Sequence, residues 1–268
     1  MALKTLKLLW KFYENETRGH LILHKFLTLS HYFIFNALSK IMPRNLVKYV
    51  FRNYIRIGFI PLKLTLRDGT IIHHHLEDYG LFFEVILNDG YELKKLGGGS
   101  VVVDVGANIG LVSVLAIKRF NAKKVISFEP CTNNFNFLKK NKEVNDCRNM
   151  IIKKVAVSDK KGKTKLYLRG SGTHSIIDKS PGSGYEIVEL TTLDDALKKE
   201  PVIDLLKIDV EGAELNVLKG ADETLKRTQK VILEWSNLAS HEEIIDILKN
   251  NGFDINVSGS MVIAQKGK

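Results

Sequence analysis

The C-terminal two thirds of the chain alternate between short apolar runs and amphipathic segments. The apolar runs predict buried strands at Val101–Asp104, Lys124–Phe128, Met150–Val157, Asp204–Ile208 and Lys230–Glu234. The segments between them predict helices at Gly110–Phe120, Asn133–Asn145, Leu193–Lys199, Ala213–Lys219 and His241–Asn251. This alternation predicts an α/β fold with a doubly wound, Rossmann-like and mostly parallel sheet.

Two further strand pairs interrupt that alternation. Lys163–Arg169 and Tyr185–Leu190 predict an antiparallel pair around a loop rich in glycine and serine, Gly170–Gly184. Gly252–Val257 and Ser260–Gln265 predict a terminal hairpin.

The N-terminal part has a different pattern. Helices are predicted at Lys4–Tyr13, Leu21–Lys40 and Leu46–Ile57, a hairpin at Pro61–Leu66 and Thr70–His75, and a short helix at Gly80–Asn88. We place the domain boundary after residue 79. Residues 1–79 then form a basic, aromatic-rich helical segment with a hairpin, and residues 80–268 form the α/β domain.

The first predicted strand ends in an acid and a glycine turn, VVVDVGANIG at Val101–Gly110. The second strand ends in Glu129-Pro130, where nucleotide-binding α/β folds place an acid on ribose hydroxyls. A dinucleotide needs G-x-G-x-x-G around its pyrophosphate, and this turn holds only two of those glycines. A carboxylate at Asp104 also repels a pyrophosphate but suits the sulfonium and ammonium of S-adenosylmethionine. The pattern favours S-adenosylmethionine over NAD.

The net charge of +10 is unevenly distributed. Twelve Lys or Arg residues and two acids lie within Met1–Arg67, and the remainder is neutral. The longest charge-free run of this segment, Phe26–Ser39, is too short and too polar to span a bilayer, and no signal peptide is recognisable. Three interpretations stay open for residues 1–57: a helical cap or dimer arm, an anionic membrane surface, or nucleic acid. Cys131 and Cys147 predict reduced thiols and a cytoplasmic protein, with peripheral membrane contact as an option.

A second motif, LKIDVEGAE at Leu206–Glu214, follows the fourth predicted strand. An aliphatic hydroxyl is a poor nucleophile and needs a nearby base. Asp209 is the first candidate for that base and Glu211 the second; each has a structural alternative, as a strand-end acid or as a first-turn helix acid. Lys207 either faces the site or forms an ion pair.

Three other polar clusters are weaker candidates. His174, in the Gly/Ser-rich loop, is a candidate general base, although an exposed loop residue is the simpler interpretation. Ser158 and Asp159 end the third strand, where an adenine amine can be bound. His73-His74-His75 resembles a metal tract, but alternate strand residues face opposite sides and no acid or cysteine completes a site, so we expect no metal.

Five motifs in this order, DVGANIG, FEP, AVSDKKG, TTLDD and LKIDVEGAE, resemble those of FkbM-type S-adenosylmethionine-dependent methyltransferases. The similarity covers about Gly80 to the C-terminus. It implies a class I methyltransferase fold with a seven-stranded, mostly parallel sheet whose last strand is antiparallel. It also implies S-adenosylmethionine as methyl donor, and mostly O-methylation. By position, it implies that the donor is bound at Asp104, Gly106, Ala107, Asn108, Gly110, Glu129, Pro130, Ser158 and Asp159. It aligns Asp209, Glu211 and Glu214 with the motif after strand four, and it does not support a general role for His174.

We therefore expect an O-methyltransferase acting on a hydroxyl of a saccharide or glycolipid-like acceptor. The alternatives are an RNA methyltransferase, for which no RNA-binding signature is present, and a membrane-peripheral binding protein with a vestigial fold. A nicotinamide oxidoreductase is disfavoured by the missing glycine. An oligomer is compatible with the sequence.

Overall fold

The computed structural model describes residues 63–74, 78–168, 174–177, 184–236 and 240–267. The chain divides into two units, Met1–Asn88 and Asp89–Lys268, which are treated separately below. The helices predicted within residues 4–57 lie outside the described residues.

The described part of the first unit contains the predicted hairpin and short helix. Strands β1 (Lys63–Thr65) and β2 (Ile71–His73) pair antiparallel around the turn at Asp68-Gly69. Helix α4 (Tyr79–Phe82) continues into a π-helical turn, η2 (Phe83–Leu87). Both predictions are confirmed, with the helix split into two types of turn.

The second unit is built on the predicted seven-stranded sheet. Its strands lie in the order β11-β12-β10-β9-β3-β4-β5. They are β3 (Val101–Val105), β4 (Lys124–Phe128), β5 (Met150–Lys153), β9 (Leu205–Ile208), β10 (Lys230–Glu234), β11 (Phe253–Ser258) and β12 (Met261–Lys266). Strand β12 runs antiparallel to both β10 and β11, and the pairs between β10 and β5 are parallel. The predicted fold class and terminal hairpin are therefore confirmed.

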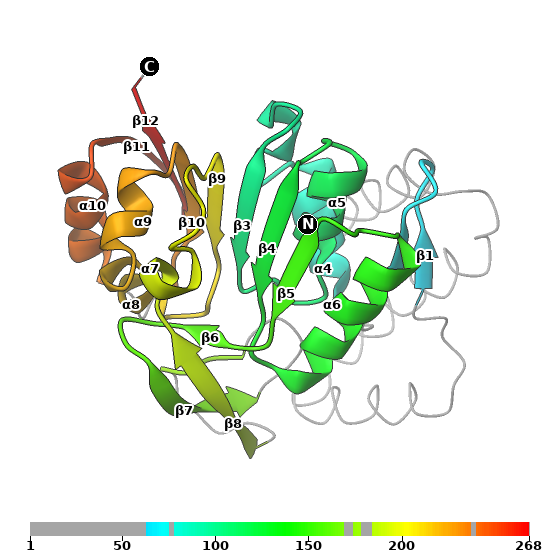
Figure 1. Ribbon diagram of the computed structural model, residues 1–268, viewed down its shortest axis with the longest axis horizontal. Coiled ribbons are helices and arrows are strands. Elements are labelled where there is room, and N and C mark those ends of the chain that lie inside the picture. Colours follow the sequence, from blue (N-terminus) through cyan, green and yellow to red (C-terminus); the bar gives the residue numbers. More distant parts are fainter. Residues whose placement is uncertain (1–62, 75–77, 169–173, 178–183, 237–239, 268) are drawn as a thin grey trace, which may run out of the picture. The chain divides into compact units, whose positions relative to one another are not determined.

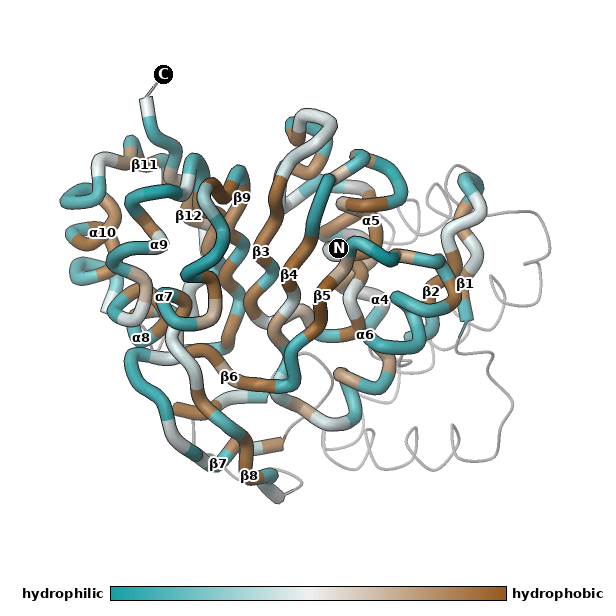
Figure 2. The backbone as a smooth tube through the Cα atoms, in the orientation of Figure 1, coloured by the Kyte–Doolittle hydropathy of each residue, from teal (hydrophilic) through white to brown (hydrophobic). Residues whose placement is uncertain are grey.

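Helices cover the sheet, which explains why its central strands are apolar on both faces. The helices are α5 (Leu111–Lys118), α6 (Thr132–Val144), α7 (Leu193–Ala196), α8 (Glu214–Lys219), α9 (Asp222–Lys226) and α10 (His241–Asn250), with a 3-10 turn, η3 (Leu93–Lys95), before the sheet. Helix α5 packs on β3 and β4, α6 on β5, and α10 on β11 and α8 (Figure 1). Figure 2 shows the central strands coloured as hydrophobic over most of their length.

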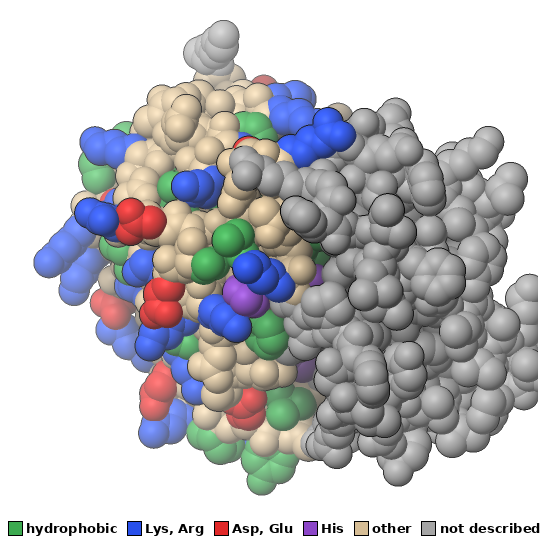
Figure 3. Space-filling model, turned by 90° about the vertical axis from the view of Figure 1, so that its right-hand side faces the viewer, with side chains coloured by type: hydrophobic (Ala, Val, Ile, Leu, Met, Phe, Trp, Pro, Cys, Tyr) green, Lys and Arg blue, Asp and Glu red, His purple; other side chains and the backbone are tan. Residues whose placement is uncertain are grey.

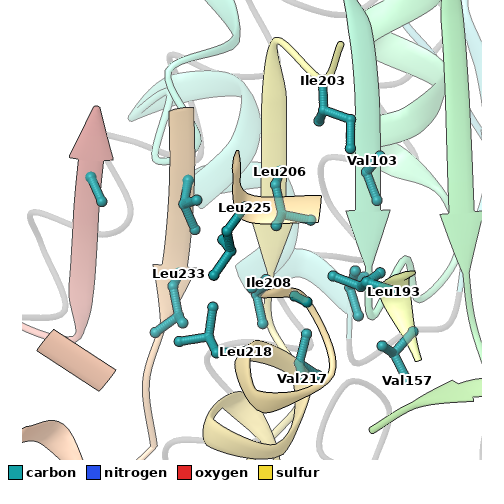
Figure 4. Packing of buried hydrophobic residues seen from close by; sticks show 14 of the residues in the cluster. Val103, Val157, Leu193, Ile203, Leu206, Ile208, Val217, Leu218, Leu225 and Leu233 are labelled. Atoms are coloured by element: carbon teal, nitrogen blue, oxygen red, sulfur yellow. The ribbon is translucent and has the colours of Figure 1, made fainter. Parts of the chain in front are cut away.

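The largest core cluster lies between the sheet and helices α7 to α10. Leu206 and Ile208 of β9 contribute to it together with Val217 and Leu218 of α8 and Leu225 of α9, all of them fully buried (Figure 4). Burying a side chain of this size contributes about 1.5–3 kcal/mol. The strand ends that carry the polar groups of the second unit are therefore held by a well-packed core.

The third predicted strand, Met150–Val157, was wrong as a single element. Strand β5 ends at Lys153, and a separate β6 (Ala156–Val157) joins β8 (Gly184–Thr191) and β7 (Gly162–Leu168) in a three-stranded sheet of order β6-β8-β7. The apolar run was read correctly, but β6 pairs with Leu190 and Thr191, far along the chain. This small sheet lies at the end of the large sheet where β3, β4 and β9 end (Figure 1).

Candidate active site

The glycine turn after β3 is held against the ends of both neighbouring strands. Gly106 and Ala107 donate their N–H groups to the Phe128 carbonyl, at 3.0 and 2.9 Å. Gly106 has φ +77°, and a Cβ there would lie 1.8 Å from the backbone oxygen of Asp209. Only glycine fits this position, because any side chain would meet rigid backbone. The turn and the segment after β9 are therefore in direct contact.

The rest of the turn leads into α5. Asn108 adopts a left-handed conformation, φ 51°, and its side-chain oxygen is buried with no hydrogen-bond partner among the described residues. Gly110 caps α5 at φ +85°, and a Cβ there would meet the Leu138 side chain at 2.4 Å. A buried polar atom without a partner is costly unless a ligand or water satisfies it. The turn thus offers an unsatisfied acceptor at the predicted donor loop.

Asp104 is at the centre of a buried polar network. It lies beside Ser127 of β4 and Lys207 of β9 in the sheet register, so the three side chains share one face. Its carboxylate accepts a hydrogen bond from Ser113 at 2.6 Å and pairs with Lys207 Nζ at 3.1 Å. Ser113 also bonds to Ser127 at 2.8 Å. Asp104 is fully buried, which makes it a support for the turn and for Lys207.

Lys207 joins the turn to the end of β9. Its Nζ donates to the Gly106 carbonyl at 2.7 Å and lies 3.6 Å from Asp209 Oδ2. Burial alone would lower the pKa of Lys207, but the Asp104 and Asp209 carboxylates outweigh it, so the pKa is raised and the ammonium stays charged. Of the two roles left open for Lys207, the ion pair is confirmed, and it faces the same cluster as Asp209.

Glu129 follows β4 and bridges the two loops. Its carboxylate accepts hydrogen bonds from the backbone of Asn108 at 2.8 Å and of Cys131 at 2.9 Å. Burial raises the pKa of the Glu129 carboxyl to about 7. Pro130 follows it and is half-buried. The ribose acid of the sequence analysis therefore lies directly against the donor loop.

Asp209 is the accessible acid of the cluster, with a side chain that is 25% exposed. Tyr91 donates a hydrogen bond to Asp209 Oδ2 at 3.0 Å, and the same hydroxyl lies 3.4 Å from Glu234 Oε2. Burial raises the pKa of Glu234, and the Asp209 carboxylate raises it further. The Lys207 ammonium lies 5.2 Å from the centre of the Tyr91 ring.

The other two acids of the second motif differ in burial: Glu211 is half-buried and Glu214 is buried. Glu211 adopts φ 54°, and its carbonyl accepts a hydrogen bond from Ser175 at 2.7 Å. Glu214 is fully buried and accepts from the Gly212 N–H at 2.8 Å, with a pKa that burial raises. Glu214 therefore supports the turn before α8.

His174 is half-buried next to Ser175, which pairs with Tyr167 of β7. The Ser175 bond to Glu211 ties this described end of the Gly/Ser-rich loop to the second motif. The role of His174 as a general base stays a prediction.

Ser158 and Asp159 follow β6. Ser158 donates to Asp159 Oδ1 at 2.9 Å, and Asn216 of α8 donates to the same atom at 3.3 Å. Gly220 allows the Ser158 carbonyl to approach, since a Cβ at Gly220 would lie 2.2 Å from it. Val157, directly before Ser158, shares a core cluster with Phe128, directly before Glu129.

The described residues hold no group of three or more His, Cys, Asp or Glu side chains that could bind a metal ion. Within the predicted tract, His74 is buried with its ring edge-on to Phe82 at 5.2 Å, and His75 lies outside the described residues. None of the described helices is long and apolar enough to cross a bilayer.

The sequence analysis missed Tyr91 and did not assign Glu234 to the site. Glu234 could be located at a strand end from the apolar run before it. Tyr91 lies in an irregular segment just before the 3-10 turn, and no periodicity connects it to β9 or β10. Its only sequence signal is a large aromatic residue in a polar, glycine-rich stretch.

The strand order, with an antiparallel β12 beside β10, and the polar groups at the ends of β3, β4 and β9 define a class I methyltransferase fold. Residues 104–255 match the methyltransferase FkbM domain, and the chain belongs to this family. Its methyl donor is S-adenosylmethionine.

The chain is similar to two curated methyltransferases over most of their length. It is 30% identical over 216 residues to methyltransferase sdnD of Sordaria araneosa, covering 67% of this chain and 83% of that protein. It is 27% identical over 234 residues to 31-O-demethyl-FK506 methyltransferase FkbM of Streptomyces tacrolimicus, covering 72% and 88%. A crystal structure of methyltransferase FkbM from Methylobacillus flagellatus aligns with TM-score 0.45 at 15% identity, covering 64% of this chain and 44% of the other.

Proposed function

We propose that this protein is an O-methyltransferase that transfers the methyl group of S-adenosylmethionine to a hydroxyl of a saccharide or glycolipid-like acceptor. The observation that carries the proposal is the position of Asp209. Its carboxylate is partly exposed, and its backbone oxygen touches Gly106 of the donor loop. A base is thereby held beside the loop that binds the donor.

The residues of the loop fit the donor. In the described cluster a single cation, Lys207, faces four acids, Asp104, Glu129, Asp209 and Glu234. The raised pKa values of Glu129 and Glu234 reduce the charge on these two groups, but the acids still outnumber the cation. This balance favours a ligand that carries a sulfonium and an ammonium, and it disfavours a pyrophosphate. The buried, unsatisfied oxygen of Asn108 offers a further acceptor to an ammonium or hydroxyl. We assign Glu129 to the ribose hydroxyls and Ser158 and Asp159 to the adenine amine.

The bound donor supplies an electrophilic methyl group on a sulfonium. The protein's own part is to align the acceptor oxygen and to remove its proton. We assign that proton to the Asp209 carboxylate. The carboxylate would accept it from the acceptor O–H as the oxygen takes the methyl group that the bound donor would supply, with the methyl–sulfur bond broken and S-adenosylhomocysteine released. Lys207 and Tyr91 hold the carboxylate in place. Glu211 is the second candidate for the base.

Two observations support a hydroxylated acceptor. A relative over most of the chain is named as a 31-O-demethyl-FK506 methyltransferase, which indicates oxygen as the atom methylated by that protein. In this chain Trp235 directly follows Glu234, is only partly buried, and stacks on His241 at 4.0 Å between ring centres. A partly exposed aromatic ring suits a sugar, which offers C–H faces to stack on it.

The RNA alternative receives less support. On the face shown in Figure 3, the Lys and Arg side chains of the described residues are scattered among Asp and Glu side chains and do not form one continuous patch. Binding to nucleic acid depends on neutralising many phosphates with clustered basic groups.

The test is a search for the methylated product. The purified full chain is incubated with S-adenosylmethionine that carries a deuterated methyl group and with separate pools of oligosaccharides, glycolipids and RNA. We expect the label on a hydroxyl of a saccharide or glycolipid, and its loss with Asp209→Asn. Label on RNA bases, or unchanged transfer by Asp209→Asn, contradicts the proposal. An exposed-site variant, Asp254→Asn, controls for the loss of a carboxylate.

For residues 1–57 we propose contact with an anionic membrane surface, supported by the concentration of basic and aromatic residues in this segment. Co-sedimentation of the full chain with vesicles tests it. Binding to vesicles that contain phosphatidylserine but not to neutral vesicles, reduced by salt, is the expected result. Equal binding to both kinds of vesicle contradicts it.

A further inference from the structure

Tyr91 places a single hydroxyl between two carboxylates. Its oxygen lies 3.0 Å from Asp209 Oδ2 and 3.4 Å from Glu234 Oε2, and the residue is 1% exposed. A phenol carries one hydrogen and can donate to one acceptor at a time. Both carboxylates can therefore be satisfied by this hydroxyl only when one of them carries a proton and donates to the phenol oxygen.

The surrounding groups decide which carboxylate carries that proton. The Tyr91 hydroxyl is nearer to Asp209, and the Lys207 ammonium lies 3.6 Å from the same Oδ2 atom. Glu234 accepts a hydrogen bond from Ser260 at 3.3 Å on its other oxygen. Both carboxylates therefore accept a hydrogen bond, and the difference between them is the ammonium beside Asp209. A cation stabilises the ionised form, so the charge is favoured on Asp209 and the proton on Glu234.

The remaining groups around the pair do not all act in the same direction. Asp104 lies behind Lys207 and keeps it charged, whereas Lys207 also lowers the pKa of Glu234, and Glu214 at the start of α8 is a further acid near Asp209. Burial and the negative charge of Asp209 outweigh these effects and raise the pKa of Glu234. With a proton on Glu234, the two contacts of the phenol become a chain of hydrogen bonds, from Glu234 to Tyr91 and from Tyr91 to Asp209.

We propose that Tyr91 is a positioning residue that keeps Asp209 ionised as the base and makes Glu234 the partner that holds a proton. This inference rests on the proposed function, in which Asp209 accepts the proton of the acceptor hydroxyl. Without the phenol, Asp209 and Glu234 would compete for one proton, and part of the protein would carry it on the base.

The test measures the titration of both carboxyl groups in the full chain, without any acceptor. Carbon-13 NMR of protein labelled at the Asp and Glu carboxyl carbons follows each group, with signals assigned by Asp209→Asn and Glu234→Gln. In the unchanged protein we expect Glu234 to take up its proton at a higher pH than an ordinary glutamate carboxyl does. A titration midpoint at or below the ordinary value overturns the proposal whatever the variants do.

Tyr91→Phe is the informative substitution, because it removes only the hydroxyl and keeps the ring under Lys207. We expect the titration midpoint of the Glu234 carboxyl to fall by about one pH unit. The reason is that protonated Glu234 loses the phenol oxygen to which it donates its hydrogen bond. An unchanged midpoint means that Tyr91 only packs, and a raised midpoint means that Tyr91 donates to Glu234; either result overturns the proposal.

Two controls separate this result from other effects. Tyr185→Phe removes the hydroxyl of a 52% exposed tyrosine on β8 and is expected to leave the midpoint of Glu234 unchanged. Calorimetric titration with S-adenosylhomocysteine checks that Tyr91→Phe still binds the product of the donor. The titration uses no acceptor, so its result does not depend on which molecule is methylated. Failure to find a saccharide acceptor would count against the proposed function and would leave the titration of Glu234 valid.

Discussion

Replacing Gly106 by alanine tests the contact between the donor loop and the end of β9. The substitution adds one methyl group at φ +77°, and that group would lie 1.8 Å from the Asp209 oxygen and 2.9 Å from its carbonyl carbon. Both atoms are backbone and cannot move aside without shifting β9. We therefore expect a loss of stability and a loss of donor binding together.

The expected loss of stability in Gly106→Ala has two parts, and other glycines of this chain allow the two to be separated. A left-handed conformation costs an alanine about 1–2 kcal/mol, and overpacking a tight site costs about 1–3 kcal/mol more. Gly106→Ala should therefore lose about 2–5 kcal/mol, a large share of the roughly 5–15 kcal/mol that stabilises a typical domain. Gly99 has φ +88° with no atom within 4 Å, so Gly99→Ala should lose only the first part.

The assay is urea-induced unfolding followed by circular dichroism, with calorimetric titration of S-adenosylhomocysteine. Gly98 has neither a positive φ nor a neighbour within 4 Å, so Gly98→Ala is the reference and should change stability by less than about 0.5 kcal/mol. The expected order of destabilisation is Gly106, then Gly99, then Gly98. A Gly106→Ala protein that is no less stable than Gly99→Ala, and that binds normally, would refute the close approach of the two loops.

Other predictions follow from the charged groups. Because burial raises the pKa of Glu129 to about 7, its folded form holds the proton more tightly than the unfolded chain. Its contribution to stability is therefore full below the pKa of the unfolded chain and falls by about 3 kcal/mol as the pH rises to about 7. This pH dependence should be absent in Glu129→Gln, and urea unfolding at several pH values measures it. Lys207→Met should cost about 3–5 kcal/mol by leaving Asp104 buried without its cation. Lys226→Met, at an exposed pair, should leave the urea midpoint nearly unchanged, and equal midpoints for the two variants would contradict the prediction. Asp209→Asn should keep S-adenosylhomocysteine binding in calorimetry but reduce methyl transfer to an identified acceptor by about 100-fold or more, and normal transfer would rule out its role as base.

The ends of the parallel strands were predictable because they depend on local patterns. Runs such as Lys124–Phe128 and Lys230–Glu234 have the predicted bounds, since an apolar strand followed by an acid marks its own end. The ion pair of Asp104 with Lys207 could not be settled in this way. It depends on β3 and β9 being neighbours in register, which is a property of the assembled sheet.

The two failures of the sequence analysis have the same cause. Strand β6 was merged with β5 because the apolar run at Met150–Val157 is nearly continuous, while the partner of β6 lies in β8. Tyr91 was missed because its function depends on Asp209 and Glu234, which are 118 and 143 residues away along the chain. Contacts over such separations leave no periodic signal in a single sequence.

The distribution of charge separates two kinds of binding within this chain. The excess positive charge lies entirely within Met1–Arg67, whereas the cluster around Lys207 carries more carboxylates than cations. A net charge of +10 therefore gives no information about the ligand of the site. The proposed donor site is rich in acids, and the proposed membrane contact lies in the basic segment. The two proposals are therefore tested with ligands of opposite charge, a sulfonium donor for the first and anionic vesicles for the second.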